Sequence, residues 1–483
     1  MHDKLTVSKI NEVFARVTCE PSIAQELSDH MTFTVPGAKF MPSVRNKFWD
    51  GKIRLFNSFT GIVYFGLLKE IKNFAKTRDY VVHYEENCKP SLTDLTDDEL
   101  NKFLNSCNLT LNPRDYQLNA FRHAITYDRG VFLSPTASGK SLIIYLLTRY
   151  YNARTLIIVP TTSLVSQLAS DFADYGFVSD SFVHRVYSGQ DKQTDKPITI
   201  STWQSIYKLD KTYFKQFDVV IGDEAHLFKA KSLTTIMEKL IDCKYRFGFT
   251  GTLDGSLTNK MVLEGLFGPV FTVTTTSKLM EQKHVADMKI KAIVLSYKEE
   301  ERKLAKNYSY QDEVDFIVRH DGRNKFLRNL GLSLEGNSLI LFQFVEKHGK
   351  ILFDMMKDKE PNRPIFFIHG GIDGEEREQI RHIVERESNA IIVASYGTFS
   401  TGINIRNLHN VVFSSPTKSR VRTLQSIGRG LRLGTEKTNA VIYDIADDLK
   451  YKNKTNFTIT HFMDRLNIYN SESFDYKIYN ADI

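Results

Sequence analysis

Three short segments, far apart in the sequence, carry side chains that could bind and cleave a nucleoside triphosphate. The first, 134–141, ends in a Gly-Lys-Ser triplet, and the second, 223–226, reads Asp-Glu-Ala-His. The third, 425–432, holds a glutamine followed by two arginines. Phosphoryl transfer needs a phosphate cradle, a carboxylate for Mg²⁺, a group that orients water and a cation for the developing charge. Together the three segments contain candidates for all of these parts.

The segment 134–141 is a candidate phosphate-binding loop, although serine replaces the leading glycine of the G-x-x-x-x-G-K-[ST] pattern. An apolar run at 130–133 precedes it and an apolar helical run at 142–147 follows it. In that setting, backbone N–H groups and a helix N-terminus face a polyphosphate. We expect Lys140 to contact the β- and γ-phosphates of ATP and Ser141 to ligate Mg²⁺. The rest of the nucleotide-binding loop would be Pro135, Thr136, Ala137, Ser138 and Gly139.

The carboxylates Asp223 and Glu224 follow another apolar run, at 218–221. Ligands of open α/β sheets bind at the carboxyl ends of the strands, which is where this pair would lie. Asp223 suits the outer sphere of Mg²⁺, and Glu224 suits activation of the attacking water. A surface Asp-Glu pair is usually only solvated charge, but the position after a strand and the spacing from Lys140 argue against that alternative.

Arg429 and Arg432 are candidates for stabilising charge on the γ-phosphate oxygens, and Gln425 belongs to the same segment. They lie in a later part of the chain than the phosphate loop. ATP hydrolysis would therefore depend on closure of a second domain over the nucleotide. The alternative for Arg432 is an ordinary basic helix face.

Two sets of apolar runs predict the sheets that would position these groups. Each run is short, rich in β-branched residues and followed by a polar turn, which is typical of a parallel sheet covered by helices on both faces. The first set is at 130–133, 155–159, 198–200 and 218–221; the second is at 338–342, 365–368, 390–393, 410–413 and 440–444. The second set has no Gly-Lys-Ser loop. We predict an α/β fold of two tandem parallel-sheet domains with a small α+β N-terminal domain.

The expected domains are 1–105, an accessory domain; 106–275, the ATP-binding domain; 276–455, the second sheet domain; and 456–483, a short tail. A chain of 483 residues is too long for one core, so several domains are reasonable. Its four cysteines are widely spaced and predict neither disulfides nor a zinc site. The N-terminus has no apolar signal segment, and no stretch reaches the length of a membrane span. We expect a cytoplasmic protein.

The N-terminal region contains a basic and aromatic segment. Between 37 and 54 there are five cations and one acid, interleaved with three aromatic residues, although the whole chain has a formal charge of only +7. Cations bind nucleic-acid phosphates without reading sequence, and aromatic rings can stack on exposed bases. The alternative is a β-hairpin with a charged outer face and Trp49 in its core. The candidate nucleic-acid contacts here are Arg45, Lys47, Trp49, Lys52 and Arg54.

The ordered segments from about 112 to 447 resemble the motif series of superfamily 2 helicases. In this resemblance, 114–117 is similar to the adenine-reading segment, 134–141 to motif I, 223–226 to motif II, 250–252 to motif III, 400–404 to motif V and 425–432 to motif VI. It implies two RecA-like domains. It also implies roles for Arg114, Gln117 and Gly402 at the nucleotide, and for Thr161, Thr202, Trp203 and Thr401 at the nucleic acid. His226 and Gln425 would link the nucleotide state to these contacts.

Within the superfamily, the chain resembles the UvsW-type recombination helicases of tailed bacteriophages. The segments that carry this resemblance include 48–55 in the N-terminal region, 158–162, 275–280 and 393–402. It implies ATP-driven unwinding and branch migration of forked or Holliday-type DNA without sequence preference, by a monomer that works beside replication or recombination proteins and away from membranes. The alternatives are an RNA-dependent ATPase, disfavoured by Gln425 and the Thr-Gly-Thr at 250–252, and an ATP-switched binding module that does not translocate.

Overall fold

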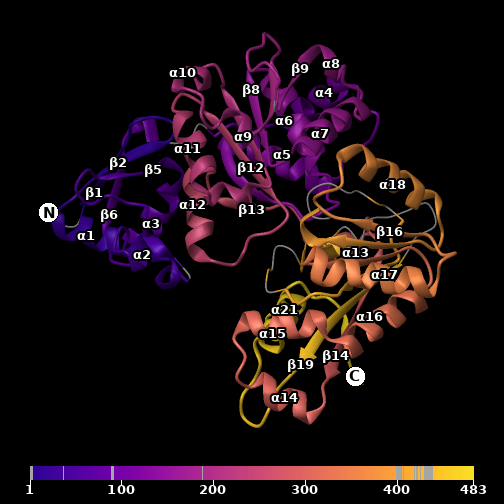
Figure 1. The fold of residues 1–483 in the computed structure, drawn as a ribbon. Coiled ribbons are helices and arrows are strands. Elements are labelled where there is room, and N and C mark those ends of the chain that lie inside the picture. The colour runs from indigo at the N-terminus through magenta and orange to yellow at the C-terminus, as the bar shows by residue number, and fades with distance from the viewer. Residues whose placement is uncertain are drawn as a thin grey trace. The chain divides into compact units, whose positions relative to one another are not determined.

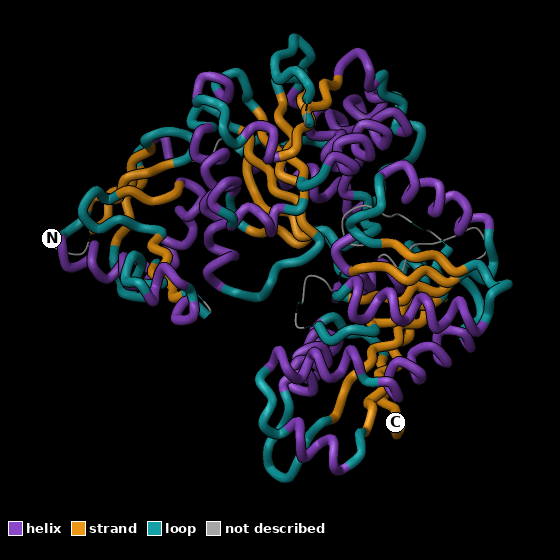
Figure 2. The backbone as a smooth tube through the Cα atoms, in the orientation of Figure 1, coloured by secondary structure: helices purple, strands orange, loops and turns teal. Residues whose placement is uncertain are grey.

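The protein is described by a computed structural model, which covers residues 4–35, 37–88, 92–187, 189–398, 405, 407–417, 419, 423–424, 426–428 and 439–483. The chain divides into two compact units: 1–134 with 139–273, and 135–138 with 274–483. Figure 1 traces the chain through its elements, and Figure 2 separates helices from strands by colour. Each unit is described by itself.

The N-terminal domain is built on a four-stranded sheet in the order β5-β2-β1-β6. β1 pairs antiparallel with β2 and parallel with β6, so the sheet is mixed. The segment between β3 and β4 adds a small two-stranded sheet and two short helices. The elements are β1 (Lys4–Lys9), β2 (Phe14–Thr18), α1 (Pro21–His30), β3 (Thr32–Thr34), η1 (Ala38–Phe40), α2 (Pro42–Arg45), β4 (Lys52–Arg54), β5 (Ile62–Tyr64), η2 (Phe65–Leu67), α3 (Leu68–Lys76), β6 (Val81–Tyr84) and η3 (Glu86–Cys88).

The first unit also contains a seven-stranded sheet in the order β13-β7-β12-β11-β8-β10-β9, and all its pairings are parallel. The apolar runs predicted at 130–133, 155–159, 198–200 and 218–221 lie in β7, β8, β10 and β11. The strands are β7 (Arg129–Leu133), β8 (Thr155–Val159), β9 (Val183–Val186), β10 (Ile198–Thr202), β11 (Val219–Asp223), β12 (Tyr245–Thr250) and β13 (Val270–Thr272).

Helices cover both faces of this sheet. One buried cluster joins α4 to α7 with one face, and another joins α9 to α12 with the other face and with the N-terminal domain. Helix α4 crosses the expected boundary at 105/106, and its Leu100 and Cys107 pack with α5 and α6. The helices are α4 (Asp97–Cys107), α5 (Asp115–Tyr127), α6 (Lys140–Tyr151), α7 (Thr162–Asp174), α8 (Ser179–Phe182), α9 (Trp203–Ile206), α10 (Lys211–Phe214), η4 (Ala225–Lys229), α11 (Lys231–Lys239) and α12 (Leu257–Phe267).

The N-terminal domain packs closely on α12. A Cβ added to Gly66 would lie 2.0 Å from the carbonyl oxygen of Glu264, so no side chain fits there. Tyr64 stacks its ring against the matching glycine of α12, Gly265, and donates a hydrogen bond to Glu238 at 2.6 Å. The N-terminal domain is thus joined to the first sheet domain by close contact between the backbones of η2 and α12.

The second unit contains another seven-stranded parallel sheet, in the order β16-β17-β15-β18-β19-β14-β20. The five apolar runs predicted between 338 and 444 all lie in its strands. The elements are α13 (Thr276–Glu281), β14 (Asp287–Ser296), α14 (Glu299–Ala305), α15 (Tyr310–Arg319), α16 (Asp321–Ser333), β15 (Ser338–Phe342), η5 (Val345–Gly349), α17 (Lys350–Lys359), β16 (Ile365–Ile368), α18 (Gly374–Arg386), β17 (Ile391–Ser395), β18 (Asn410–Phe413), β19 (Asn439–Asp448), α21 (Phe457–Ser471) and β20 (Tyr476–Asp482).

These two parallel sheets and the mixed N-terminal sheet confirm the predicted fold class. Residues 456–483, expected as a short tail, instead form α21 and the edge strand β20, which pairs with β14 along seven residues. Edge strands such as β20 are mostly exposed and therefore lack the apolar run of a central strand. The boundaries of the individual domains stay a prediction. Among the described residues, no helix is long and apolar enough to span a membrane.

Candidate ATP and DNA sites

The phosphate loop lies where the sequence predicts, between the end of β7 and the start of α6. Gly139 has φ +76°, and a Cβ added there would lie 2.3 Å from Nε2 of Gln117. The positive φ therefore favours glycine at this position, and a side chain there would also displace the end of the Gln117 side chain. Helix α6 begins at Lys140, so its positive N-terminal end lies at the loop, where helix N-termini favour anions.

The backbone conformation of Ser134 explains why the first position of the loop can be serine. Its N–H donates to the carbonyl of Thr250 at 2.8 Å, which continues the pairing of β7 with β12, and its side chain is fully buried. The φ angle of Ser134 is not positive, whereas Ala137 has φ +67°. The left-handed turn of the loop is therefore made later, at Ala137 and Gly139, and the first position needs no glycine.

Lys140 and the two carboxylates form one cluster in the first unit. The Nζ of Lys140 lies 3.4 Å from Oε1 of Glu224 and 3.9 Å from Oδ1 of Asp223. Glu224 has φ +51°, a left-handed conformation that is uncommon for a residue with a side chain, directly after β11. Its N–H donates to Oδ1 of Asp223 at 2.9 Å. This turn brings both carboxylates to the lysine.

The cluster is partly buried, and the charges within it shift the pKa values of its two carboxyl groups. Burial raises the pKa of Asp223, and the adjacent negative charge of Glu224 adds to that shift. For Glu224, burial alone would raise the pKa, but the Lys140 ammonium and His226 more than offset it, and the pKa is lowered. A group of two carboxylates facing one ammonium is short of positive charge. That deficit suits a divalent cation, and Mg²⁺ commonly takes one or two carboxylates together with substrate phosphates.

His226 connects this cluster to the end of β12. Its Nδ1 lies 3.0 Å from Oγ1 of Thr250 and 3.3 Å from Oε2 of Glu224. The Thr250 hydroxyl in turn donates to the carbonyl of Thr252 at 2.9 Å. The imidazole of His226 thus lies between the Glu224 carboxylate and the Thr-Gly-Thr segment and contacts both.

Gln117 lies beside the phosphate loop, and Arg114 lies next to Gln117 at the start of α5. Gln117 is 4% exposed; its Oε1 accepts from the N–H of Arg114 at 2.8 Å, and its Nε2 donates to the carbonyl of Gly139 at 3.4 Å. The guanidinium of Arg114 donates to the hydroxyl of Tyr116 at 2.8 Å. Gln117 therefore links the start of α5 to the loop glycine.

Tyr175 is a neighbour of the site that sequence spacing did not reveal. Its hydroxyl lies 2.6 Å from Oγ of Ser141, the expected Mg²⁺ ligand. Burial raises the pKa of Tyr175 to about 12, so the phenol stays protonated at neutral pH and can hold the serine hydroxyl. The two residues are 34 positions apart, and no motif includes the tyrosine.

We expect Tyr175→Phe to raise the Mg²⁺ concentration needed for half-maximal ATPase activity by about 2–10-fold, the worth of one hydrogen bond that orients a ligand. Mg²⁺ titrations of the ATPase rate and of fluorescent-nucleotide binding would measure this change. The matched control is Tyr150→Phe, which removes a hydroxyl from the far end of α6. Equal Mg²⁺ requirements in the two variants would contradict a positioning role for Tyr175.

Of the residues expected at nucleic acid in this domain, Thr202 ends β10, and Thr161 follows the neighbouring strand β8 by two residues. Thr161 caps α7, its hydroxyl accepting from the N–H of Leu164 at 3.4 Å, and remains partly exposed. Thr202 is 5% exposed and its hydroxyl pairs with that of Ser205 at 2.9 Å. Trp203 is half-buried and packs against the core. Only Thr161 of these three offers a partly exposed hydroxyl.

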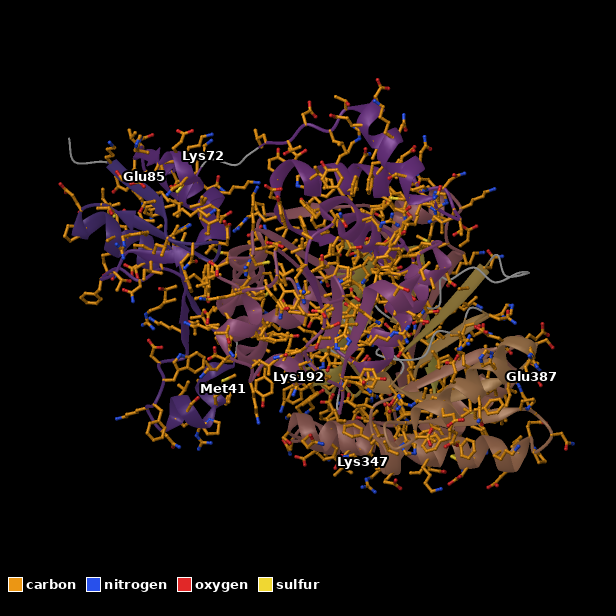
Figure 3. The ribbon with its side chains drawn as sticks, turned by 90° about the horizontal axis from the view of Figure 1, so that it is seen from above. Met41, Lys72, Glu85, Lys192, Lys347 and Glu387 are labelled. Atoms are coloured by element: carbon orange, nitrogen blue, oxygen red, sulfur yellow. The ribbon has the colours of Figure 1, made fainter. Side chains whose placement is uncertain are left out.

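The basic segment of the N-terminal domain projects its aromatic rings into solvent. Phe40 is 72% and Phe48 85% exposed, and Trp49 is half-buried outside the domain's core cluster, with its indole N–H on the carbonyl of Lys52 at 3.0 Å. The alternative with Trp49 in a core therefore does not hold. Figure 3 shows Met41 in this segment, away from Lys72 of α3 and from Glu85, which follows β6. Arg45, Lys47, Lys52 and Arg54 are all exposed.

Five predicted site residues lie outside the residues that the structure describes: Thr401, Gly402, Gln425, Arg429 and Arg432. In the described parts of the chain, no group of three or more His, Cys, Asp or Glu side chains could hold a metal by itself.

Two parallel-sheet domains in tandem, with a phosphate loop and a carboxylate pair at the carboxyl edge of the first sheet, define a helicase-type ATPase of superfamily 2. Three family models match separate parts of the chain. Residues 7–85 match the N-terminal domain of the DNA helicase UvsW, residues 110–255 the res subunit of type III restriction enzymes, and residues 322–434 the helicase conserved C-terminal domain.

The chain is 36% identical to the ATP-dependent DNA helicase uvsW of Enterobacteria phage T4, and the alignment covers 97% of each protein. The crystal structure of T4 UvsW is similar over 99% of both chains, with a TM-score of 0.53 and 32% identity. The chain therefore belongs to the UvsW family of ATP-dependent DNA helicases.

Two more distant comparisons cover only part of this chain. The chain is 26% identical to the DNA 3'-5' translocase XPB2 of Sulfurisphaera tokodaii, over 58% of this chain and 59% of that one. The type ISP restriction-modification enzyme LlaBIII, solved bound to DNA, aligns with 77% of this chain and 32% of its own, with a TM-score of 0.57. At 16% identity, that likeness shows the fold alone.

Proposed function

We propose that this helicase unwinds and branch-migrates branched DNA, such as forks and four-way junctions, by hydrolysing ATP with Mg²⁺. The observation that supports the ATPase activity is the cluster of Lys140, Asp223 and Glu224 beside a phosphate loop in which Gly139 has φ +76°. The DNA half rests on family membership and on the exposed cations and aromatic rings of the N-terminal domain.

In this proposal, Lys140 and the N-terminus of α6 hold the phosphates, and Ser141 and Asp223 hold Mg²⁺. The metal would neutralise charge on the phosphate oxygens. Glu224 orients the attacking water and takes its proton, and Gln117 and Arg114 hold the adenine. We assign stabilisation of the transition-state charge to Arg429 and Arg432, with Gln425 beside them.

The DNA would be held without sequence preference, because the proposed contacts are cations, aromatic faces and hydroxyl groups rather than base-edge readers. The N-terminal contacts are those of the exposed segment, and the contacts in the two sheet domains are Thr161, Thr202, Trp203 and Thr401. We further propose that the protein acts as a monomer in the cytoplasm, beside proteins of replication or recombination.

One set of assays tests this function. ATPase rates are compared without nucleic acid, with a synthetic fork, with a four-way junction and with an RNA duplex, and strand separation is followed on the same substrates. We expect stimulation and unwinding by branched DNA, both lost in Lys140→Ala. Stimulation by RNA alone would indicate an RNA-dependent ATPase. Tight ATP-dependent binding without strand separation would indicate a switched binding module.

The charge reversals Arg45→Glu and Lys47→Glu, made together, should weaken fork binding and reduce the slope of log K against log[salt] by about 2, one unit for each lost phosphate contact. Binding measured by fluorescence anisotropy at several salt concentrations would check this. The matched control is Lys72→Glu with Lys76→Glu, two exposed lysines of α3 in the same domain. An equal slope for both double variants would refute DNA contact by the segment.

A further inference from the structure

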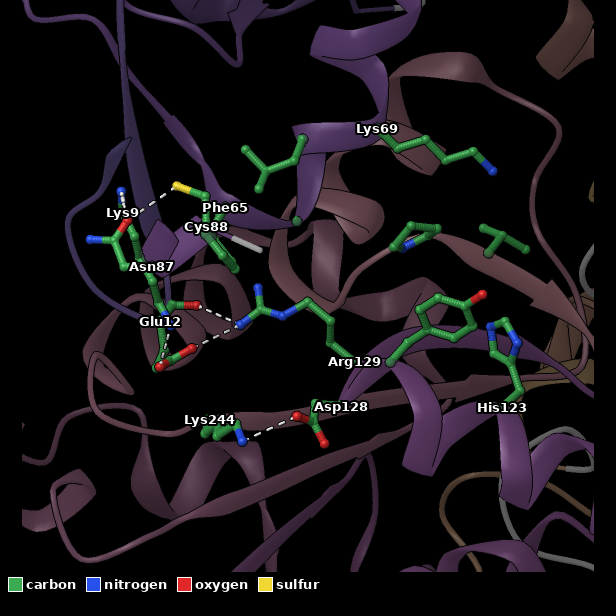
Figure 4. Close-up of a pocket in the computed structure, with 15 residues that line it drawn as sticks. Lys9, Glu12, Phe65, Lys69, Asn87, Cys88, His123, Asp128, Arg129 and Lys244 are labelled. Carbon is green, nitrogen blue, oxygen red and sulfur yellow. Dashed lines mark hydrogen bonds and ion pairs between the residues drawn. The ribbon is translucent and has the colours of Figure 1, made fainter. Parts of the chain in front are cut away.

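A pocket of about 500 Å³ opens between the N-terminal domain and the first sheet domain, within the first unit (Figure 4). The N-terminal domain contributes residues from the ends of β1, η2 and α3, and the sheet domain contributes residues from α5, β7 and the start of β13. Its volume lies in the range of small-molecule sites, about 300–1,000 Å³. None of the residues assigned above to ATP or DNA lines it.

The pocket lies at the edge of the sheet opposite the ATP site. Arg129, which lines it, begins β7, whereas the phosphate loop follows the last residue of that strand, Leu133. A strand advances about 3.3 Å per residue, so the two sites are separated by the length of β7. A ligand of this pocket is thus distinct from the nucleotide that drives the motor.

Cations outnumber acids among the lining residues. Glu12 accepts from Nζ of Lys9 at 2.6 Å and from Nη2 of Arg129 at 3.2 Å, so one carboxylate serves two cations. Asp128 pairs with Lys244 at 3.2 Å. Lys69, on an exposed position of α3, is a further lining cation. Four cations therefore face two acids, which leaves a positive field in a partly enclosed space.

Arg129 is the most buried of these cations and is incompletely satisfied. Its Nη1 is buried and has no hydrogen-bond partner among the described residues. Burial, together with the positive charge of Arg246, lowers the pKa of Arg129 to about 10. Arg246 itself is fully buried and donates only to the carbonyls of Leu266, Leu240 and Met237. Because Arg129 shares the carboxylate of Glu12 with Lys9, an additional negative charge near Arg129 would offset the remaining positive charge.

Planar rings form the other walls. The ring of Phe65 lies under both Lys9 and Arg129, at 4.9 and 4.6 Å from its centroid. His123 lies 4.6 Å from the ring of Tyr127, and burial together with Lys69 lowers its pKa, so that it is neutral at neutral pH. Figure 4 shows Arg129 directed toward Glu12, with His123 on the other side of the pocket. The walls suit a flat apolar body.

We propose that this pocket binds a small planar organic anion, about the size of a nucleoside monophosphate, with its ring system against the aromatic walls and its acidic group in the field of Lys69, Lys9 and Arg129. The charge excess selects an anion, and the aromatic lining selects a flat ring. The acidic group is a phosphate or a carboxylate, since both accept hydrogen bonds from ammonium and guanidinium groups.

The test uses the full chain with its motor site filled by a non-hydrolysable ATP analogue and Mg²⁺. Two probes, dAMP for the phosphate and 2-naphthoate for the carboxylate, are titrated by saturation-transfer NMR up to several millimolar. Lys69→Glu reverses the exposed lining cation, and its matched control is Lys72→Glu, which lies on the same helix but outside the pocket. Thermal melting confirms that both variants fold.

We expect at least one probe to bind the wild type and the Lys72→Glu variant alike, and to bind the Lys69→Glu variant about fivefold or more weakly, because the field at the pocket is reduced. Weakening of dAMP alone identifies a phosphate ligand, weakening of 2-naphthoate alone a carboxylate, and weakening of both a site for either. Absence of binding by both probes, or equal affinities in the two variants, would overturn the proposal.

Discussion

Glu224→Gln should lower ATP turnover by about 10²–10⁴-fold while leaving ATP binding close to that of the wild type. Glutamine has the same shape and can keep the contact with Lys140, 3.4 Å away, but it cannot accept a proton from water. The Lys140 ammonium and His226 lower the pKa of Glu224 despite its burial, so in this arrangement the carboxylate is ionised but weakly basic. When Lys140 binds phosphate instead, the carboxylate loses part of that stabilisation and becomes a stronger base.

Steady-state ATPase rates and equilibrium binding of a fluorescent ATP analogue would separate the two effects. Lys140→Ala is the comparison, because it should weaken binding as well as turnover. If Glu224→Gln turned over ATP near the wild-type rate, another group would be the base. If it lost affinity as much as Lys140→Ala, Glu224 would serve to hold the nucleotide rather than to activate water.

The central strands could be predicted because burial on both faces imposes continuous apolar runs. β8, β10, β15 and β17 are buried at every position, and each coincides with a predicted run. Strands that are exposed on one face, lie at an edge of a sheet or contain a buried charged residue have no continuous apolar run. β14 alternates buried and exposed positions, β20 is mostly exposed, and β12 contains the buried Arg246. The prediction therefore missed these strands for a physical reason.

The parts of the site that consist of residues adjacent in the sequence could be predicted. The loop and the carboxylate pair are local patterns, and the structure brings Lys140, Asp223 and Glu224 together. The contact of Ser141 with Tyr175 and the pocket around Arg129 depend on residues brought together only by the fold. Likewise, nothing local indicated whether Trp49 was buried, and the structure decides this question. Roles assigned to the individual site residues stay predictions.

The C-terminal segment, expected as a tail, is fixed to the second sheet by a buried ion pair. Arg465 of α21 is 2% exposed, and its Nε and Nη2 donate to Asp444 of β19 at 2.8–3.1 Å. Tyr469, one helical turn further on, donates its hydroxyl to the same carboxylate at 2.8 Å. The remaining guanidinium nitrogen, Nη1, donates to the carbonyl of Thr417 at 2.8 Å. Asp444 of β19 therefore accepts hydrogen bonds from Nε and Nη2 of Arg465 and from the hydroxyl of Tyr469, and these bonds hold α21 on the sheet.

Asp444→Ala should destabilise the second unit by about 3–5 kcal/mol, because it leaves a guanidinium buried without its counter-ion. The matched control is Asp464→Ala, an exposed acid on α21, which should change stability by less than about 0.5 kcal/mol. Denaturant unfolding followed by circular dichroism, with limited proteolysis of 456–483, would measure both effects. If 456–483 were a dispensable tail, Asp444→Ala would lower the free energy of unfolding no more than the loss of a surface carboxylate does. The two variants would then unfold at the same denaturant concentration. A large difference between them, with early cleavage after β19, requires α21 and β20 to be part of the folded sheet domain.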